Sequence, residues 1–402
     1  MIACRMRRDL SYTERDMAEQ IPINPALLVW ARERAGLSNI EATEKFRRFD
    51  EWEAGESAPT YAQLEQLSDA LKVPIAVFFF PEPPNVPSIN ETFRTLPEAE
   101  LDRLPSRIRL LMRKAKAFQL NLAELTGGRN PSERLITRDL EFKPRVNITN
   151  MTTAVREYIG VSLEDQRGWR DAETAMKQWR AALQQVGVFV FKDAFRVRDL
   201  SGFCLYDDQF PVIYVNNSAT KTRQIFTYFH ELAHLIFHTS GIDKVRDRYI
   251  DRLAGDSKQI EVLCNSFAAQ FLMPEDAFNL AVAGRRADEA TAEIIAAQFH
   301  VSREVVFRRF FDHGRIDEAQ YREAVERWTA QWEGGGAGGG GEGGGGNHYW
   351  TKLSYLGREY VSLALGQFHQ NRIDETQLAE FLDTKPKNVG TLEDYFGRGV
   401  AV

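Results

Sequence analysis

The stretch FTYFHELAHLIFH, residues 226–238, constrains the fold more than any other part of this 402-residue chain. It has the apolar content of a helix with almost no face suited to water, yet it carries three of the chain's seven histidines and one glutamate. Polar groups that are buried without partners cost free energy. The fold must therefore bring a second polar element against this helix.

His230 and His234 lie four residues apart, so on a helix both imidazoles project from one face toward a single point. With Glu231 beside them they form the HExxH pattern, in which two histidines bind a metal ion and the glutamate acts as general base. Such a pair also occurs by chance as hydrogen-bonded core residues, but the burial of the whole helix favours a metal ion. Catalytic zinc takes three protein ligands and keeps one open position, so one more ligand is expected.

The third ligand must come from another helix, because the extended HExxHxxGxxH pattern fails at Phe237 and Ser240. Glu261 in IEVLCNSFAAQFLMP is the next polar group on an otherwise apolar helix, and we predict that it is this ligand. Asn265 lies one turn later on the same face, so we predict that it supports the ligands from behind.

An alternative source of the third ligand is a set of four aspartates, Asp243, Asp247, Asp251 and Asp256. Their surroundings are polar and turn-like, which is typical of a solvated surface. His238 drifts about 80° around the helix from His230, so we expect it to support the site or pack in the core. Cys264 is expected to be a small buried apolar residue.

The remaining pattern predicts an α+β fold that is mostly helical. Three short β-rich runs between residues 186 and 217 predict a small sheet, and residues 170–185 form an amphipathic helical pattern before it. The glycine-rich run at 333–347 predicts a flexible tether. The predicted parts are a polar N-terminal extension (1–20), a helix-turn-helix-like domain (21–84), a helical connector (85–149), the HExxH domain (150–332), the linker (333–347) and a C-terminal helical domain (348–402).

Composition limits the setting in which the chain works. The net charge of −6 gives no overall basic surface, so contact with nucleic acid would need a local patch. Cys4, Cys204 and Cys264 are too few for a disulfide framework or a four-thiolate zinc site, which suits a reducing compartment. The N-terminal residues lack the apolar segment of a signal peptide. We therefore expect a cytoplasmic protein without a membrane span.

The two helical motifs FTYFHELAHLIFH and IEVLCNSFAAQFLMP together resemble the ImmA/IrrE family of metallopeptidases, whose second motif usually reads ExxANxFAAxLLMP. The resemblance covers roughly residues 150–320 and departs from the pattern at Cys264, where alanine is usual. It implies one zinc ion per chain, or manganese in its place, on His230, His234 and Glu261, with Glu231 as general base. It also implies a protein substrate, a repressor whose cleavage releases stress-response or mobile-element genes.

Residues 21–84 resemble the XRE-type helix-turn-helix domain that is fused to many of these peptidases. Where a full version has a second helix, a turn and a recognition helix, only residues 39–51 remain. Lys45, Arg47 and Arg48 are the candidate DNA-contacting residues of this shortened region. The alternative is a degenerate helical module for dimerisation or substrate docking. A homodimer is therefore also expected as a possible form of the protein.

Two further segments have a helix-turn-helix rhythm, residues 297–314 and 375–396. We predict that the first packs against the rest of the protein, and the acidic character of the second argues against DNA binding.

The leading hypothesis is a zinc endopeptidase. Its alternative is a DNA-binding regulator or antitoxin-like protein with a structural or vestigial zinc site, and a sensor whose terminal parts gate the protease is compatible with both. Tyr228 points away on helical spacing, so no oxyanion-stabilising donor is assigned.

Overall fold

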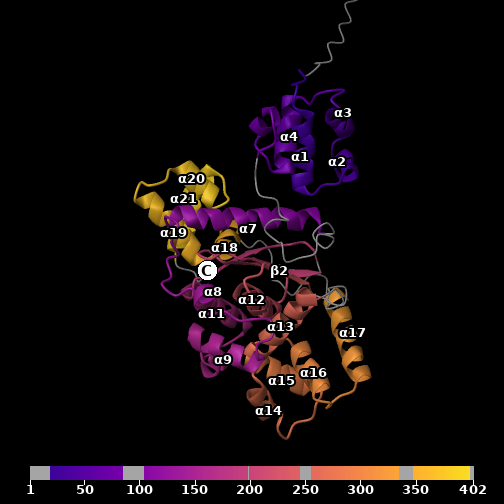
Figure 1. Ribbon diagram of the computed structural model, residues 1–402, viewed down its shortest axis with the longest axis vertical. Helices are drawn as coiled ribbons and strands as arrows, with labels where there is room; N and C mark the ends of the chain where they lie inside the picture. The colour runs from indigo at the N-terminus through magenta and orange to yellow at the C-terminus, as the bar shows by residue number, and fades with distance from the viewer. Residues whose placement is uncertain (1–18, 85–103, 198, 245–254, 335–346, 399–402) are drawn as a thin grey trace, which may run out of the picture. The chain divides into compact units, whose positions relative to one another are not determined.

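The computed structural model describes residues 19–84, 104–197, 199–244, 255–334 and 347–398 (Figure 1). The chain forms two compact units, residues 1–88 and 89–402. Most of the predicted N-terminal extension and of the glycine-rich tether lies outside the described residues. Among those that are described, no helix is both long and apolar enough to cross a membrane.

The first unit is a small helical domain built around the buried aromatic residues Phe49 and Trp52. Its elements are α1 (Pro25–Ala35), α2 (Asn39–Lys45), α3 (Phe49–Glu53), α4 (Tyr61–Leu71) and the 3₁₀ helix η1 (Ile75–Phe79). The side chain of Thr60 caps α4 in a reciprocal hydrogen-bonded box with Gln63. Helix α3 has five residues, so it offers little length for entering a DNA groove.

The second unit contains a four-stranded sheet in the order β1-β3-β2-β4. The strands are β1 (Phe189–Asp193), β2 (Leu200–Leu205), β3 (Val212–Asn216) and β4 (Ile242–Lys244). Strands β1 and β3 are parallel, whereas β2 runs antiparallel to both β3 and β4. The sequence predicted three of these strands. It missed β4, because three residues are too short to display the alternation of a strand.

Helices cover the first face of the sheet, where Val190, Cys204 and Val215 point. The helices of this part of the unit are α8 (Ile136–Asp139), α9 (Ile148–Ile159), α10 (Leu163–Gly168), α11 (Ala172–Gln185), α12 (Lys221–Ile236), α13 (Gly255–Leu272), α14 (Glu275–Val282), α15 (Glu289–Phe299), α16 (Arg303–Asp312) and α17 (Glu318–Gly334). Helix α12 packs on β2 and against α13. Gly202 permits this approach, because a Cβ there would lie 2.5 Å from Cγ2 of Thr227.

Helices α15 and α16 form the predicted helix-turn-helix-like segment at 297–314. Phe307 and Phe310 of α16 are buried in the core. The Arg309 guanidinium donates to Gln270 Oε1 at 3.0 Å and to the Met273 carbonyl at 2.9 Å. These contacts are those of a packing unit, in which part of the basic character faces the protein.

The second face of the sheet presents Phe191, Phe203 and Tyr214, which are fully or almost fully buried. The helices that cover them are α7 (Ser106–Leu125), α18 (His348–Leu356), α19 (Arg358–His369), α20 (Glu375–Phe381), the 3₁₀ helix η3 (Pro386–Asn388) and α21 (Val389–Gly397) (Figure 1). The predicted connector, HExxH domain and C-terminal domain all fall within the one compact unit at 89–402. The physical reason is that an apolar second face requires a cover, and the connector and C-terminal helices supply it.

Charged groups reinforce the contact between these helices and the sheet. The Lys114 ammonium on α7 lies 2.9 Å from an oxygen of Asp193 in β1 and 2.8 Å from an oxygen of Asp383 after α20. Arg107 pairs with Asp193, and Lys352 pairs with Asp383. The ion pairs thus connect β1, α7, α18 and the end of α20.

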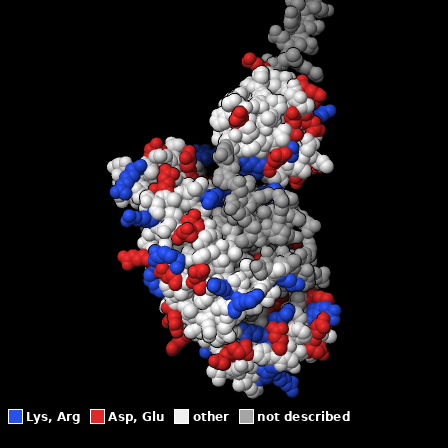
Figure 2. Space-filling view, viewed as in Figure 1, with Lys and Arg blue, Asp and Glu red and all other residues white. Residues whose placement is uncertain are grey.

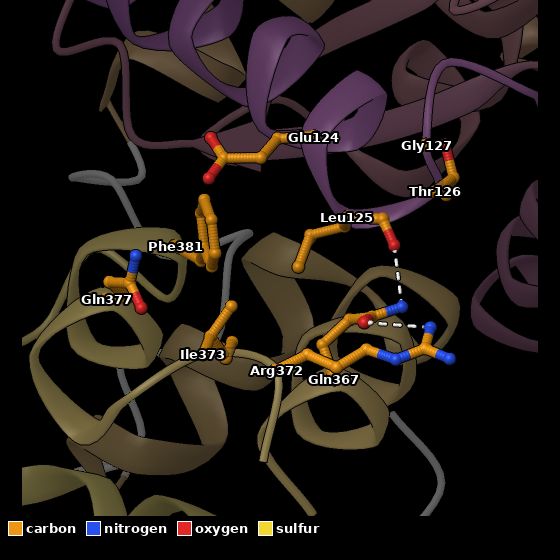
Figure 3. Close-up of a pocket in the computed structure, with 9 residues that line it drawn as sticks. All are labelled: Glu124, Leu125, Thr126, Gly127, Gln367, Arg372, Ile373, Gln377 and Phe381. Atoms are coloured by element: carbon orange, nitrogen blue, oxygen red, sulfur yellow. Dashed lines mark hydrogen bonds between the residues drawn. The ribbon is translucent and has the colours of Figure 1, made fainter. Parts of the chain in front are cut away.

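A cavity of about 440 Å³ lies where the end of α7 meets α19 and α20 (Figure 3). Its lining includes Glu124, Arg372 and Phe381, and the Gln367 amide donates to the Leu125 carbonyl at 2.8 Å beside it. No residue of α12 or α13 lines this cavity, so it is separate from the candidate site on those helices.

Arg180 connects the two layers on opposite faces of the sheet. Its buried guanidinium, which comes from α11, donates to the Val190 carbonyl of β1 and to the carbonyls of Ser354 (2.6 Å) and Tyr355 (3.2 Å). These last two lie at the carbonyl end of α18, where the helix dipole favours a cation. Gly357 follows with φ of +88°, and a Cβ on it would collide with the guanidinium.

We expect Gly357→Ala to lower the free energy of unfolding by about 2–4 kcal/mol, because it adds a strained positive φ to a steric collision. Denaturant unfolding of the full chain measures this value. Gly366→Ala in α19 is the matched control: its Cβ meets nothing within 4 Å, so it should be neutral or stabilise by about 0.5–1 kcal/mol. Equal effects of the two substitutions would contradict the role of the Arg180 contact.

Candidate metal centre

Helix α12 carries two of the candidate ligands. It begins after Thr220, whose hydroxyl accepts from the Arg223 N–H, and every residue from Thr227 to Ile236 is buried. His230 and His234 project from this helix toward α13, which carries Glu261. The packing of α12 on α13 therefore places the Glu261 carboxylate beside the two buried histidines.

The three side chains meet in one compact, buried cluster. The Nε2 atoms of His230 and His234 lie 3.2 Å apart. Oε1 of Glu261 lies 3.2 Å from His234 Nε2, and Oε2 lies 3.5 Å from His230 Nε2. One atom from each residue falls within 4.8 Å of the other two, and none of the three residues is more than 3% exposed. The structure thus brings together the three residues that the sequence predicted as ligands.

Hydrogen bonds on the far side of each ring fix which nitrogen faces the cluster. Nδ1 of His230 lies 3.0 Å from Oδ1 of Asn265, and Nδ1 of His234 lies 3.2 Å from Oγ1 of Thr239. The Thr239 hydroxyl donates to the His234 carbonyl, so its oxygen accepts from the ring. Neutral imidazoles therefore carry their proton on Nδ1 and point the Nε2 lone pairs at Glu261.

The titration behaviour of the cluster follows from this convergence of acceptors. Burial disfavours the charged form of His230, but Asp243, Glu261 and Glu231 outweigh it and raise the pKa of His230 to about 9. Burial acts to raise the pKa of Glu261, yet His234 and His230 hold it well below its usual range. Both shifts favour a positive charge among the three side chains.

Glu231 lies beside this cluster without belonging to it. It is fully buried, and neither carboxylate oxygen accepts a hydrogen bond of normal geometry from a described residue. Burial raises the pKa of Glu231 to about 7, with His234 and His230 acting in the opposite direction. A carboxylate with such a pKa can both accept and return a proton near neutral pH.

The residues fit a catalytic metal ion. Two imidazole nitrogens and one carboxylate are a donor set of catalytic zinc, and the unpartnered Glu231 carboxylate adjoins them. Gly241 completes the seat of one ligand, because a Cβ at this position would lie 2.5 Å from Cδ2 and Cγ of His234. Backbone thus lies directly against the imidazole, and the ring has little freedom to turn.

Asp243 differs from its predicted place on a solvated surface. It is 2% exposed on β4 and accepts from Arg223 Nη2 at 2.6 Å and from Thr227 Oγ1 at 2.8 Å. The prediction failed because pairing of β4 with β2 brings a polar segment back onto α12. Asp247 and Asp251, as well as the side chain of Asp256, lie outside the described residues.

His238 lies just past the end of α12 with φ of +56° and is not a member of the cluster. Its Nε2 lies 2.9 Å from the Thr137 carbonyl, and its ring centroid is 4.8 Å from that of Tyr206. Cys264 is fully buried, and Tyr228 is buried with its ring 5.9 Å from the Lys192 ammonium. None of these three residues contributes an atom to the His–His–Glu cluster.

The sequence missed the two residues that hold His234 from the loop after α12, Thr239 and Gly241. A small hydroxyl residue and a glycine after a helix are also ordinary turn residues. Their spacing from His234 carries no ligand signature. The residues HTSG at 238–241 predict a turn after the helix, but they do not reveal that this turn folds back onto the ring of His234.

We expect Gly241→Ala to reduce zinc content strongly, because its Cβ would displace the His234 ring from its position facing Glu261. Metal analysis of the purified full chain measures the loss. Gly168→Ala is the control, since a Cβ at Gly168 meets nothing within 4 Å. Full zinc occupancy in Gly241→Ala would contradict the conclusion that the Gly241 backbone holds the His234 ring in position.

We also expect metal-free protein to lose stability as the pH rises from about 6.5 to about 9. The folded pKa of His230 is raised from 6.5 to about 9, so its stabilising contribution is complete below 6.5 and lost above 9. The contribution of Glu261, whose pKa is lowered, disappears instead as the pH falls below 4.5. Thermal unfolding of chelator-treated protein across this range measures the effect.

The zinc-loaded protein and the His230→Gln variant are the controls for this pH dependence. Zinc should weaken the alkaline loss, because a metal-bound imidazole is neutral. His230→Gln should flatten the metal-free profile. A metal-free profile that is flat in the native chain between these pH values would contradict the charge assignment.

A comparison with protein families finds the same region. Residues 183–311 match the model of the Peptidase_M78 family, described as the IrrE N-terminal-like domain. No curated protein matches the chain. The matched region contains α12 and α13, and with them His230, Glu231, His234 and Glu261. The match supports the resemblance to the ImmA/IrrE family and a metallopeptidase-like function for this part of the chain.

Proposed function

We propose that this protein is a zinc-dependent endopeptidase of the HExxH type that cleaves a specific protein, a transcriptional repressor. One observation carries the proposal: the Nε2 atoms of His230 and His234 and the carboxylate of Glu261 converge on one point. The buried carboxylate of Glu231, which accepts no hydrogen bond of normal geometry from a described residue, lies close enough to both imidazoles to interact with their charge. The resemblance to the ImmA/IrrE family is the basis for naming a repressor as the substrate, stress-response or mobile-element genes as the regulated genes, and zinc as the metal. Manganese is the alternative metal.

The chain's own residues would divide the chemistry as follows. His230, His234 and Glu261 hold the ion, which supplies Lewis-acid chemistry when bound. Glu231 takes a proton from water as the water attacks the scissile carbonyl, and then returns that proton to the leaving amine. A pKa of about 7 suits Glu231 to both transfers. Asn265 and Thr239 would keep the imidazoles oriented, because they lie within hydrogen-bonding distance of the Nδ1 atoms, which leaves each Nε2 facing Glu261.

The charge of residues 21–84 weighs against the alternative of a DNA-binding regulator. This domain has ten acidic and six basic residues, a formal net charge of −4. Lys45, Arg47 and Arg48 are exposed, but the Arg48 guanidinium pairs with Glu51 at 2.6 Å. Figure 2 shows acidic side chains gathered along one edge of the unit. DNA-binding domains carry a basic face, so substrate docking or dimerisation suits this domain better.

The number of ligands also weighs against a purely structural zinc site. Structural zinc is almost always held by four protein ligands, whereas the described residues form a cluster of three. Among the described residues, the buried Glu231 carboxylate accepts no hydrogen bond of normal geometry, so its polar atoms are not used in structural hydrogen bonds there. It has a use if a reacting water must be deprotonated there.

We expect Glu231→Gln to keep zinc and to lose cleavage by on the order of 10²–10⁴-fold, because the substitution removes the proton acceptor and preserves shape. New protein N-termini are compared between cells that express the native chain and cells that express the variant, with and without DNA damage. Glu124→Gln, on α7 in the lining of the separate cavity, is the control and should behave as the native chain. Identical termini from native and Glu231→Gln chains would overturn the proposal in favour of the regulator.

A further inference from the structure

We propose that Arg223 and Asp243 are positioning residues for His234: their ion pair clamps β4 to α12 and thereby seats the Gly241 backbone against the imidazole. Neither residue belongs to the ligand cluster, and neither is needed for the proton transfers. The proposal rests on the metal-binding part of the proposed function. It does not require that the protein cleave a peptide.

The clamp joins three elements through one carboxylate and one guanidinium. Asp243 on β4 accepts from Arg223 Nη2 at 2.6 Å through Oδ1 and from Thr227 Oγ1 at 2.8 Å through Oδ2. Arg223 and Thr227 lie one turn apart on α12. Arg223 Nε also donates to Ser201 Oγ on β2 at 2.8 Å. Both oxygens of Asp243 are thus bonded to α12, and the same guanidinium is bonded to β2.

Two residues before Asp243, the backbone of Gly241 is held from the sheet side. The Gly241 N–H donates to Cys204 Sγ at 3.2 Å, and the Gly241 carbonyl accepts from the Cys204 N–H at 3.1 Å. The segment Thr239–Asp243 is therefore fixed by β2 at Gly241 and by α12 at Asp243. The same segment lies against His234, with Thr239 bonded to Nδ1 and the Gly241 backbone against the ring.

The chemistry of the clamp favours a role in geometry over one in stability. An ion pair with a partner as buried as Asp243 carries a desolvation penalty, and well-packed apolar side chains often stabilise a fold equally well. An ion pair with two hydrogen-bonded oxygens differs in that it fixes distance and direction. This ion pair fixes the distance between β4 and α12. A small shift of β4 toward α12 would press the Gly241 backbone into the His234 ring, and a shift away would give the ring room to rotate.

The test uses Co²⁺ as the probe in the full chain, because its visible absorption reports ligand geometry without any peptidase assay. Asp243→Asn, Arg223→Lys and Arg223→Met are titrated with Co²⁺, and zinc affinity is measured by competition with a chelator. The matched control is Asp312→Asn, which breaks the Arg308–Asp312 ion pair on α16. We expect Asp243→Asn and Arg223→Met to lose about 10–100-fold in metal affinity and to alter the Co²⁺ spectrum. Arg223→Lys, which keeps the charge, should recover most of both, and Asp312→Asn should match the native chain.

Unchanged Co²⁺ affinity and spectrum in Asp243→Asn would overturn the proposal, even if the variant unfolded at a lower temperature. If Asp243→Asn fails to fold, the two Arg223 variants decide: recovery by lysine but not by methionine supports the clamp, and equal behaviour of the two overturns it. Absence of peptidase activity in the native chain would count against the proposed function alone. The Co²⁺ comparison would still report on the position of His234.

Discussion

The structure of the second unit depends on one constraint: two imidazoles and one carboxylate are buried together where helices α12 and α13 meet. His230, His234 and Glu261 solve the problem jointly, because three acceptors around one point are stable only with a cation between them. The bonds from Asn265 and Thr239 leave the Nε2 lone pairs no other direction. Burial, which is costly for each group alone, thus becomes the condition for a strong metal site.

The rest of the unit keeps that interface in place. Alternation along the strands sends one set of apolar side chains toward α12 and the other toward α7 and the C-terminal helices. A helix that carries buried ligands requires a rigid sheet behind it, and a sheet with two apolar faces requires cover on both. Helices distant in sequence from the site therefore contribute to it, through the buried Arg180 contact and the ion pairs of Lys114.

The sequence predicted well what depends on local periodicity and poorly what depends on distant pairing. Spacing and apolar context alone singled out His230, His234 and Glu261, because residues four apart on a helix share a face wherever the helix packs. The pairing of β4 with β2 places Thr239 and Gly241 against His234 and buries Asp243. A strand of three residues is too short to be recognised from the sequence, so these positions could not be predicted. The C-terminal helices were predicted as a separate domain because a glycine-rich segment indicates a flexible linker. Such a segment does not indicate what the helices after it pack against.

The same convergence determines what the site does without metal. Because the acidic groups around His230 raise its pKa to about 9, protonated His230 is favoured in the metal-free site near neutral pH, with its Nε2 3.5 Å from an oxygen of Glu261. Metal binding must then displace this proton, so metal affinity rises with pH until the imidazole is neutral in the free site. A proton and a metal ion would both offset the negative charge of the same side chains, and in the proposed mechanism only the metal ion supplies the Lewis acidity that Glu231 requires. The side-chain arrangement that satisfies the buried polar groups is thus the same one that the proposed catalysis requires.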